Sequence, residues 1–272
     1  MDQYKQYNDA MLQSYSARTA SELSAYMLER VRPGMQILDV GCGPGSITTD
    51  LATHVLQDGH VVGLDCNEDA IVAAQELARD RNTPNVRFVV GDVLNLPFAD
   101  GAFDIVHAHQ VLGHLPSGDG EPGPVRGLRE MRRVCKPGGL VCAREAEWSS
   151  AVVHPKIPGL RETWDLMEKL SYNKGTLLSG GRIREFARRA GFPRENIWAS
   201  AAAVTYTNPT GREWWGDNMA RRLEASESQA KGVELGLVSK EEYAAMIAAW
   251  RAWAKHEDGF YSMIDGQIIC TK

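Results

Sequence analysis

A glycine-rich loop follows the first short apolar run of the sequence and leads directly into a predicted helix. The segment reads Ile-Leu-Asp-Val-Gly-Cys-Gly-Pro-Gly over residues 37–45. Gly41, Gly43 and Gly45 allow a sharp turn and leave bare backbone against which a ligand can lie. In open α/β sheets, ligands bind beyond the carboxyl ends of the strands, which is where this loop falls. The second apolar run ends at Asp65, a position suited to accept hydrogen bonds from two ribose hydroxyls.

The spacing of the glycines distinguishes between two classes of cofactor. A dinucleotide loop has the pattern G-x-G-x-x-G and places a helix N-terminus against the pyrophosphate. Here the pattern is G-x-G-x-G, so the third glycine comes one residue early. Asp39, just before the loop, is an unfavourable neighbour for a phosphate, but it suits a cationic ligand that carries an amino group. S-adenosylmethionine is a sulfonium with an α-amine and a ribose, so the loop favours it over NAD.

The elements that must position this loop alternate between two hydrophobic periods. Short apolar runs predict strands, and the segments between them repeat apolar residues every three or four positions, as helices do. Strands are expected at residues 36–40, 60–65, 86–90, 103–108, 140–144, 197–207 and 261–270, and helices at 16–31, 46–56, 68–80, 123–135, 182–190, 210–230 and 239–256. The pattern predicts an α/β fold with a doubly wound, mostly parallel seven-stranded sheet and helices on both faces.

The chain contains no linker-like or repetitive segment, so we expect a single domain over residues 1–272. Residues 209–258 are expected to form a helical insertion before the last strand. Residues 136–139 are expected to form a turn into the fifth strand. The charge cluster at residues 129–133, Arg-Glu-Met-Arg-Arg, is interpreted as a solvated helix face and not as a binding patch.

The composition argues against several functional classes. The chain has 30 Lys and Arg against 35 Asp and Glu, so it lacks the basic character typical of nucleic-acid-binding proteins. No apolar stretch approaches the ~20 residues of a membrane span, and the polar N-terminus lacks the apolar core of a secretory signal. Five cysteines without a C-x-x-C pair indicate reduced thiols and no metal site. We therefore expect a cytoplasmic globular protein with no nucleic-acid partner, and a homodimer is left open.

Four motifs together resemble those of class I S-adenosylmethionine-dependent methyltransferases. The glycine loop is similar to their first motif. Later motifs are matched, in order and spacing, by residues 91–93 (Gly-Asp-Val), 103–106 (Phe-Asp-Ile-Val) and 136–139 (Lys-Pro-Gly-Gly). The likeness covers residues 16–145 and points to the branch that includes ubiquinone/menaquinone-biosynthesis methyltransferases. It implies a Rossmann-like methyltransferase fold and S-adenosylmethionine as cofactor, with S-adenosylhomocysteine as product.

The resemblance also implies a role for each residue around the methionine and ribose portions of the cofactor. Gly41, Gly43 and Gly45 would line the methionine portion. Asp39 would lie near the amine or be oriented through a water molecule. Asp65 would bind the ribose hydroxyls.

Five further residues would surround the adenine and the sulfonium. Cys66 would flank the adenine ring. Asp92 would accept from the adenine amino group, and Val93 would donate its backbone N–H. His109 and Gln110, at the end of the fourth strand, would face the sulfonium.

In this branch of the family a helix near the N-terminus covers the cofactor, so residues 1–32 are expected to form a helical cap. Arg18 lies just ahead of that helix and is a candidate to bind the cofactor carboxylate through a charge-assisted fork. The alternative is an exposed arginine at a helix start. Cys42, inside the loop at the cofactor, is interpreted as a small packing residue because nothing nearby suggests an activated thiolate.

Methyl transfer places small demands on the protein, because the sulfonium is already an activated donor. The protein holds the acceptor at attack distance and removes at most one proton. The candidate bases are His109, His114 and Glu147. Alternatively, His114 satisfies backbone groups under the sheet, and Glu147 binds a polar handle or is solvated. Aromatic residues that could wall a substrate pocket are Tyr4, Tyr7, Tyr15, Trp148, Trp164, Tyr206, Trp214 and Trp215.

These observations predict a methyltransferase that acts on a small molecule, in secondary or quinone-type metabolism. The main alternative is an S-adenosylmethionine-binding enzyme of the same fold that uses the sulfonium charge for a cyclisation or decarboxylation. A non-enzymatic regulator is disfavoured because the aspartates and the glycine loop are all intact. A nucleic-acid methyltransferase is disfavoured because residues 109–112, His-Gln-Val-Leu, lack the Asn/Asp-Pro-Pro-aromatic signature.

Overall fold

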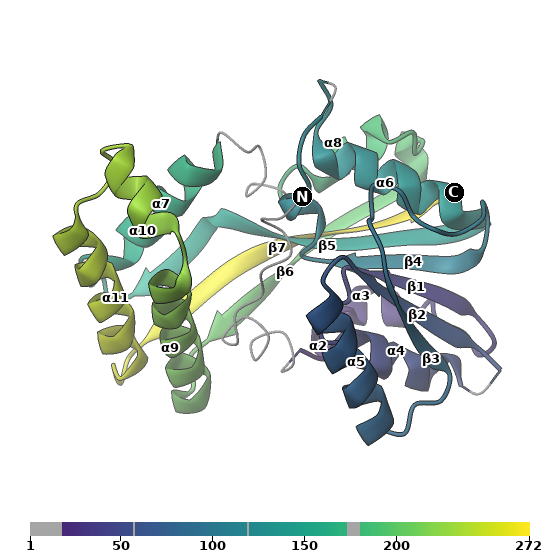
Figure 1. Cartoon of the computed structure of the whole chain (residues 1–272), viewed down its shortest axis with the longest axis horizontal. Helices are drawn as coiled ribbons and strands as arrows, with labels where there is room; N and C mark the ends of the chain where they lie inside the picture. Colours follow the sequence, from purple (N-terminus) through teal and green to yellow (C-terminus); the bar gives the residue numbers. More distant parts are fainter. Residues whose placement is uncertain (1–17, 57, 119, 173–179) are drawn as a thin grey trace. The chain divides into compact units, whose positions relative to one another are not determined.

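A computed structural model describes residues 18–56, 58–118, 120–172 and 180–272 (Figure 1). Tyr4, Tyr7, Tyr15 and the first part of the expected N-terminal cap lie outside the described residues. The chain forms two compact units. The first comprises Met1–Glu145, Ser179–Ser200 and Gly266–Lys272, and the second comprises Ala146–Leu178 and Ala201–Asp265.

The sheet has seven strands in the order β3-β2-β1-β4-β5-β7-β6. The strands are β1 (Gln36–Val40), β2 (His60–Asp65), β3 (Val86–Val90), β4 (Phe103–His109), β5 (Cys135–His154), β6 (Ile197–Tyr206) and β7 (Phe260–Thr271). β1 pairs in parallel with β2 and β4, β2 with β3, and β4 with β5. The end of β7 meets the start of β5 in the antiparallel sense, through backbone bonds between Lys272 and Gly138 and Gly139. The predicted mostly parallel, seven-stranded sheet is confirmed.

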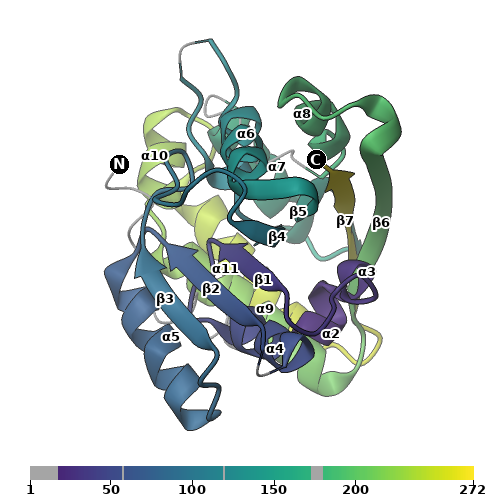
Figure 2. The ribbon, with the colours of Figure 1, turned by 90° about the vertical axis from the view of Figure 1, so that its right-hand side faces the viewer.

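Helices cover both faces of the sheet in the first unit (Figure 2). They are α2 (Ala20–Leu23), α3 (Ala25–Leu28), α4 (Ser46–Val55), α5 (Glu68–Asp80), η2 (Leu112–His114), α6 (Gly123–Val134), α8 (Ile183–Arg189) and η3 (Arg194–Asn196). Successive side chains of β1 point to opposite faces of the sheet, as strand geometry requires. Leu38 and Val40 join the core under α6 and α8, whereas Ile37 joins the core under α4. Asp39 therefore points to the α4 side.

The helix expected over residues 16–31 is instead two short helices, α2 and α3, separated at Ser24. The buried Arg144 guanidinium donates to the carbonyl oxygens of Glu22 and Leu23, at 3.3 and 3.1 Å. These are carbonyls that a continuous helix would use for its own hydrogen bonds. The periodicity of the segment does not reveal the break because its cause comes from a distant part of the chain.

The fifth strand is longer than expected at both ends. The predicted turn at residues 136–139 lies inside β5, although Gly138 has the positive φ of 77° that a turn glycine would show. Bonds from Gly138 and Gly139 to Lys272 keep this stretch in the sheet. Beyond residue 145, β5 continues into the second unit.

The second unit is built around aromatic side chains. Its helices are α7 (Leu160–Tyr172), α9 (Pro209–Ala225), α10 (Ser228–Glu234) and α11 (Lys240–Ala254). The helical insertion before the last strand is confirmed, but residues 210–230 form two helices and α7 has no counterpart among the predicted elements. Its buried aromatic residues are Trp164, Trp215, Tyr243, Trp250, Trp253 and Tyr261.

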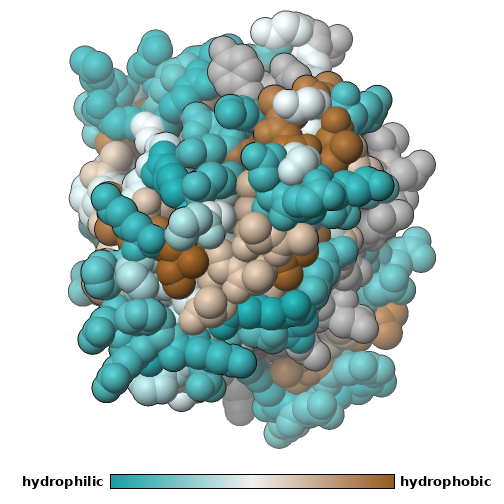
Figure 3. Space-filling view, turned by 90° about the vertical axis from the view of Figure 1, so that its left-hand side faces the viewer, coloured by the Kyte–Doolittle hydropathy of each residue, from teal (hydrophilic) through white to brown (hydrophobic). Residues whose placement is uncertain are grey.

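The surface in Figure 3 is mainly hydrophilic, with hydrophobic side chains in small separate groups. Scattered groups of this kind are ordinary on a folded protein. Among the described residues, no helix combines the length and the apolar character that a membrane crossing requires.

Candidate functional site

The glycine loop joins β1 to α4 in a conformation that favours glycine. Gly41, Gly43 and Gly45 have φ values of 66°, 53° and 79°. A Cβ atom on Gly41 would overlap the side chain of Val111, and one on Gly45 would lie 2.8 Å from the Cβ of Ala74. Larger residues at these two positions would push the loop away from its neighbours. The predicted bare-backbone loop at the carboxyl end of β1 is therefore present.

Asp65 ends β2 and binds the glycine loop directly. Its side chain is buried, and its Oδ2 accepts from the backbone N–H of Gly43 at 2.9 Å. Its Oδ1 accepts from the backbone N–H of Asn67 at 3.0 Å. Each carboxylate oxygen has two lone pairs, so Asp65 can accept further bonds from ligand hydroxyls. The structure brings Asp65 to the loop as expected, and its ribose-binding role stays a prediction.

Asp39 belongs to a buried chain of hydrogen bonds that connects four elements. Its Oδ2 accepts from Thr48 Oγ1 of α4 at 2.6 Å, and its Oδ1 lies 2.8 Å from His107 Nδ1 of β4. His107 Nε2 lies 3.1 Å from Ser24 Oγ, at the break between α2 and α3. Both oxygens of Asp39 are thus engaged within the protein, and its contact with the cofactor amine stays a prediction.

The sequence did not identify the other three members of this hydrogen-bond series, Ser24, Thr48 and His107. One signal was available, because Asp39 and His107 are polar residues within two apolar strands. The structure makes them direct partners in the β1–β4 register. Two polar residues at matching positions of adjacent buried strands indicate a pair that satisfies each other.

His109 is buried at the end of β4, and neither ring nitrogen has a hydrogen-bond partner among the described residues. Burial, followed by the nearby guanidinium groups of Arg18 and Arg144, holds the pKa of His109 well below its usual value. The imidazole is therefore neutral near pH 7. Buried polar atoms normally have partners, so two unpaired nitrogens in one ring point to a ligand.

Gln110 follows His109 in a left-handed conformation, with φ of 53°. Such a conformation is costly for a residue with a side chain, and it recurs at functional sites. The Gln110 side chain accepts from the Arg18 guanidinium at 2.7 Å, and its backbone N–H donates to the carbonyl of Arg144 at 2.8 Å. Arg18, Gln110 and His109 are thus brought together at one strand end, and their roles toward the cofactor carboxylate and sulfonium stay predictions.

Glu145 and Tyr26 are two further residues that the sequence reasoning missed. The buried Glu145 carboxylate accepts three backbone N–H bonds, from Val111 at 2.8 Å, Leu112 at 2.7 Å and Gly113 at 3.2 Å. It thereby fixes the turn that follows β4. The Tyr26 hydroxyl is buried without a partner among the described residues, and burial raises the pKa of this phenol well above its usual value. In the sequence, the spacing of Tyr26 within the expected helix indicated only membership of an apolar helix face.

The residues expected around the adenine lie after β2 and β3. Cys66 follows Asp65 and is half-buried, and Asp92 is exposed and accepts from the backbone N–H of Leu94 at 2.9 Å. Val93 is buried. In the loop, burial raises the pKa of the Cys42 thiol well above its usual value, and the charges of nearby aspartates raise it further. Cys42 is therefore protonated at neutral pH and is no activated thiolate, in agreement with the sequence.

The other two candidate bases lie in different surroundings from His109. His114 is exposed at the end of η2. The alternative interpretation placed this side chain under the sheet, whereas the structure leaves it exposed. Glu147 belongs to the second unit, where its Oε1 accepts from Ser149 Oγ at 2.6 Å. The catalytic roles of all three residues stay predictions.

The residues of the first unit fit S-adenosylmethionine by their chemistry. Asp65 and Asp92 offer oxygen acceptors to hydroxyl and amino groups, and Arg18 offers a fork to a carboxylate. The glycine loop lets a ligand approach the backbone closely. The polar atoms of His109 and Tyr26 that have no partner among the described residues suit contact with a polar ligand. No part of this set requires a phosphate.

Comparison with known proteins supports the same reading. Residues 32–191 match the family described as methyltransferase domain. An uncharacterized methyltransferase of Schizosaccharomyces pombe is 33% identical over 266 residues, covering 96% of this chain and 92% of the relative. A demethylmenaquinone methyltransferase of Desulfitobacterium hafniense is 31% identical over 171 residues, covering 62% and 63% of the two chains. The crystal structure of YcgJ from Bacillus subtilis shares the fold, with a TM-score of 0.59 at 17% identity, covering 93% and 98%.

Proposed function

The chain belongs to the S-adenosylmethionine-dependent methyltransferase family, and on that basis we propose that it methylates a small organic molecule in secondary or quinone-type metabolism. The observation that carries the proposal is the set of buried polar residues at the carboxyl ends of β1, β2 and β4. The similarity to a demethylmenaquinone methyltransferase supports a quinone-type acceptor.

In this proposal the first unit holds the cofactor, which supplies an activated methyl group when bound. Arg18, already oriented by Gln110, binds the cofactor carboxylate. Asp65 binds the ribose hydroxyls, and Asp92 binds the adenine amino group. The left-handed glycine loop lets the methionine portion lie against backbone N–H groups.

His109 is the proposed base that removes a proton from the acceptor. It is neutral near pH 7 and therefore adds no positive charge beside a sulfonium. Arg18 is one of the charges that lower the pKa of His109, so a carboxylate bound to Arg18 would restore part of the basicity of the imidazole. His114 and Glu147 remain as the other candidate bases.

The second unit is the proposed source of acceptor specificity, through the helical insertion at residues 209–258. Aromatic rings gather in the second unit as a whole: the ring centroids of Tyr206 and Trp215 are 4.8 Å apart in a stacked pair, and those of Trp148 and Trp164 are 4.7 Å apart. The indole N–H groups of Trp164 and Trp215 are buried without partners among the described residues. Flat apolar walls and two free donors suit an aromatic molecule with oxygen substituents, such as a phenol or a hydroquinone.

Isothermal titration calorimetry with S-adenosylmethionine and S-adenosylhomocysteine tests the cofactor site. Asp65→Ala should weaken binding by about tenfold or more, because it removes charged hydrogen-bond acceptors. Glu147→Ala in the second unit, and Asp69→Ala on the exposed first turn of α5, should leave the dissociation constants unchanged. If the wild-type protein binds neither compound, the proposal is refuted.

A screen of phenols and hydroquinones, read out by mass spectrometry, tests the reaction. A methylated product together with S-adenosylhomocysteine is the expected result. A rearranged or decarboxylated product without S-adenosylhomocysteine would instead assign the chain to the non-methylating alternative.

A further inference from the structure

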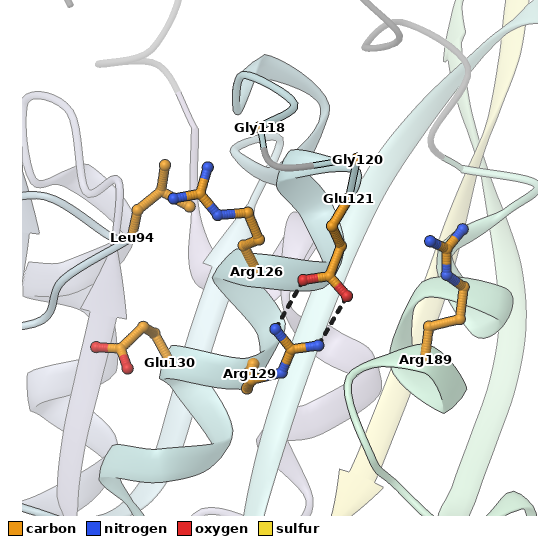
Figure 4. Close-up of a pocket in the computed structure, with 8 residues that line it drawn as sticks. All are labelled: Leu94, Gly118, Gly120, Glu121, Arg126, Arg129, Glu130 and Arg189. Carbon is orange, nitrogen blue, oxygen red and sulfur yellow. Dashed lines mark hydrogen bonds and ion pairs between the residues drawn. The ribbon is translucent and has the colours of Figure 1, made fainter.

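The first unit contains a cavity of about 630 Å³ beside α6 (Figure 4). Three arginines line it, Arg126 and Arg129 from α6 and Arg189 from the end of α8. The rest of the wall is formed by Leu94, Gly118, Gly120, Glu121 and Glu130. Asp119, between the two glycines, lies outside the described residues. Three guanidinium groups around one cavity are an unusual feature in a chain with a net charge of −5.

A protein carboxylate already occupies the middle of this arginine cluster. Glu121 binds the Arg129 guanidinium through both of its oxygens, at 2.7 and 2.8 Å. Figure 4 shows Arg126 and Arg189 on either side of this pair. The bonds from Arg129, and then the charges of Arg189 and Arg126, lower the pKa of Glu121. All three arginines therefore act on one carboxylate.

Among the described residues, the acidic side chains nearby do not balance the other two arginines. Arg126 makes no hydrogen bond or ion pair with any described residue. Within the described ranges, the one acidic partner of Arg189 is Glu185 at 3.4 Å, and Glu185 also accepts two bonds from Arg182 at 3.1 Å.

Glu130, the second acid of the wall, is also engaged elsewhere. Arg133 donates to both of its oxygens, at 2.9 and 2.8 Å. Its Oε2 also accepts from the backbone N–H of Leu96 at 2.9 Å. Two guanidinium groups of the cavity therefore retain hydrogen-bonding capacity.

We propose that this cavity binds the phosphoryl group of a small molecule through Arg126 and Arg189, and that the phosphoryl group competes with Glu121 for Arg129. Guanidinium forks match phosphate oxygens in geometry and charge, and the volume leaves room for the remainder of a metabolite. Neither S-adenosylmethionine nor S-adenosylhomocysteine carries a phosphate. The proposal therefore does not depend on the proposed function.

Calorimetric titration of the full chain with inorganic pyrophosphate, at constant ionic strength, tests the proposal. Arg126→Gln should weaken binding by about fivefold or more, since a charged contact is lost, and Glu121→Gln should strengthen it by about as much, since the internal competitor is weakened. General charge attraction would change the affinity in the same two directions, so a built site is recognised by a control variant that removes an equal charge elsewhere on the protein.

Two control variants complete the test. Arg79→Gln changes an exposed arginine of α5 that lies 4.0 Å from Glu76, and it should leave pyrophosphate binding unchanged. Arg18→Gln should also leave it unchanged, which excludes binding at the cofactor site. No measurable binding of pyrophosphate to the wild type at millimolar concentration, or equal affinities in the Arg126 and Glu121 variants, would overturn the proposal.

Discussion

At the scale of single residues, His109 combines features that ordinary packing does not explain. It is 6% exposed, and both of its ring nitrogens lack partners among the described residues. Burial, and then two guanidinium groups, lower its pKa. A buried polar group without a partner costs about 1–3 kcal/mol of stability. A ligand that supplies the missing partner recovers this free energy. The neighbouring left-handed Gln110 is a second sign of strain at the same strand end.

The pH dependence of stability should reveal His109. In the unfolded chain a histidine takes up a proton near pH 6.5, whereas the folded chain keeps His109 neutral to lower pH. The unfolded state therefore binds more protons below about pH 6.5, and His109 lowers the free energy of unfolding by up to about 1.4 kcal/mol per pH unit there. His109→Asn should remove this contribution.

The free energy of unfolding, measured with urea from pH 8 to pH 5, tests this prediction. The contributions of the other histidines are the same in both proteins and cancel in the difference. The wild type should lose more stability than His109→Asn as the pH falls below about 6.5. Parallel curves for the two proteins would show that His109 titrates normally in the folded state.

At the scale of elements, the candidate site lies where several segments are tied together by buried carboxylates. Glu145 fixes the turn after β4, and Asp39 joins β1 to α4 and, through His107, to the break between α2 and α3. Arg144 holds the last carbonyls of α2. The charge cluster of α6 has a similar positioning role, since Arg133 donates to the carbonyls of Leu96 and Phe98.

His107 lies between Asp39 and Ser24 in the buried series of hydrogen bonds, so replacing His107 should reduce stability more than replacing Ser24. His107→Leu leaves the buried Asp39 carboxylate with one partner fewer, at an expected loss of roughly 2–4 kcal/mol in the free energy of unfolding. Ser24→Ala removes only the outer hydrogen bond, for about 1 kcal/mol. Urea denaturation of the two variants measures the difference.

A second substitution separates the carboxylate charge from simple loss of packing. Asp39→Asn in the His107→Leu background should recover part of the stability, because a neutral side chain is less costly to bury without a partner. If the double variant is as unstable as the sum of the two single variants, the hydrogen-bond chain does not act as a unit.

At the scale of the whole molecule, the two units differ in the chemistry of their interiors. The residues proposed to bind the cofactor belong to the first unit, and the large aromatic cluster belongs to the second. Within that cluster, Trp250 is fully buried and donates to Thr163 Oγ1 at 3.1 Å. The expectation of a single domain over residues 1–272 stays a prediction, and a homodimer stays open.

Core substitutions in the two units should therefore differ in their effect on cofactor binding. Trp250→Ala should lower the free energy of unfolding by about 3–5 kcal/mol. The folded fraction should still bind S-adenosylhomocysteine with an unchanged dissociation constant. Leu38→Ala, in the core beside the glycine loop, should reduce both stability and affinity. Calorimetry combined with thermal unfolding tests this, and loss of binding in Trp250→Ala alone would contradict it.

The sequence by itself determined the seven strands, the helices that follow β1, β2 and β4, the glycine loop and the aspartate at the end of β2. These features depend on local preferences, because hydrophobic period and glycine conformation act over a few residues. The predicted bounds of β1, β2, β3 and α5 match the structure for this reason. The family resemblance likewise depended on short motifs at the ends of strands.

Only the tertiary structure decided which polar residues meet in the interior. The break at Ser24 depends on Arg144, and the partner of Asp39 is His107, both far away in the chain. Such contacts form when strands pair side by side, and their register is not encoded in any one segment. The arginine cavity was not predictable from the sequence for the same reason, because Arg189 of α8 is distant in the sequence from Arg126 and Arg129. The sequence thus indicated the cofactor, and the folded chain determined the surroundings in which its candidate residues act.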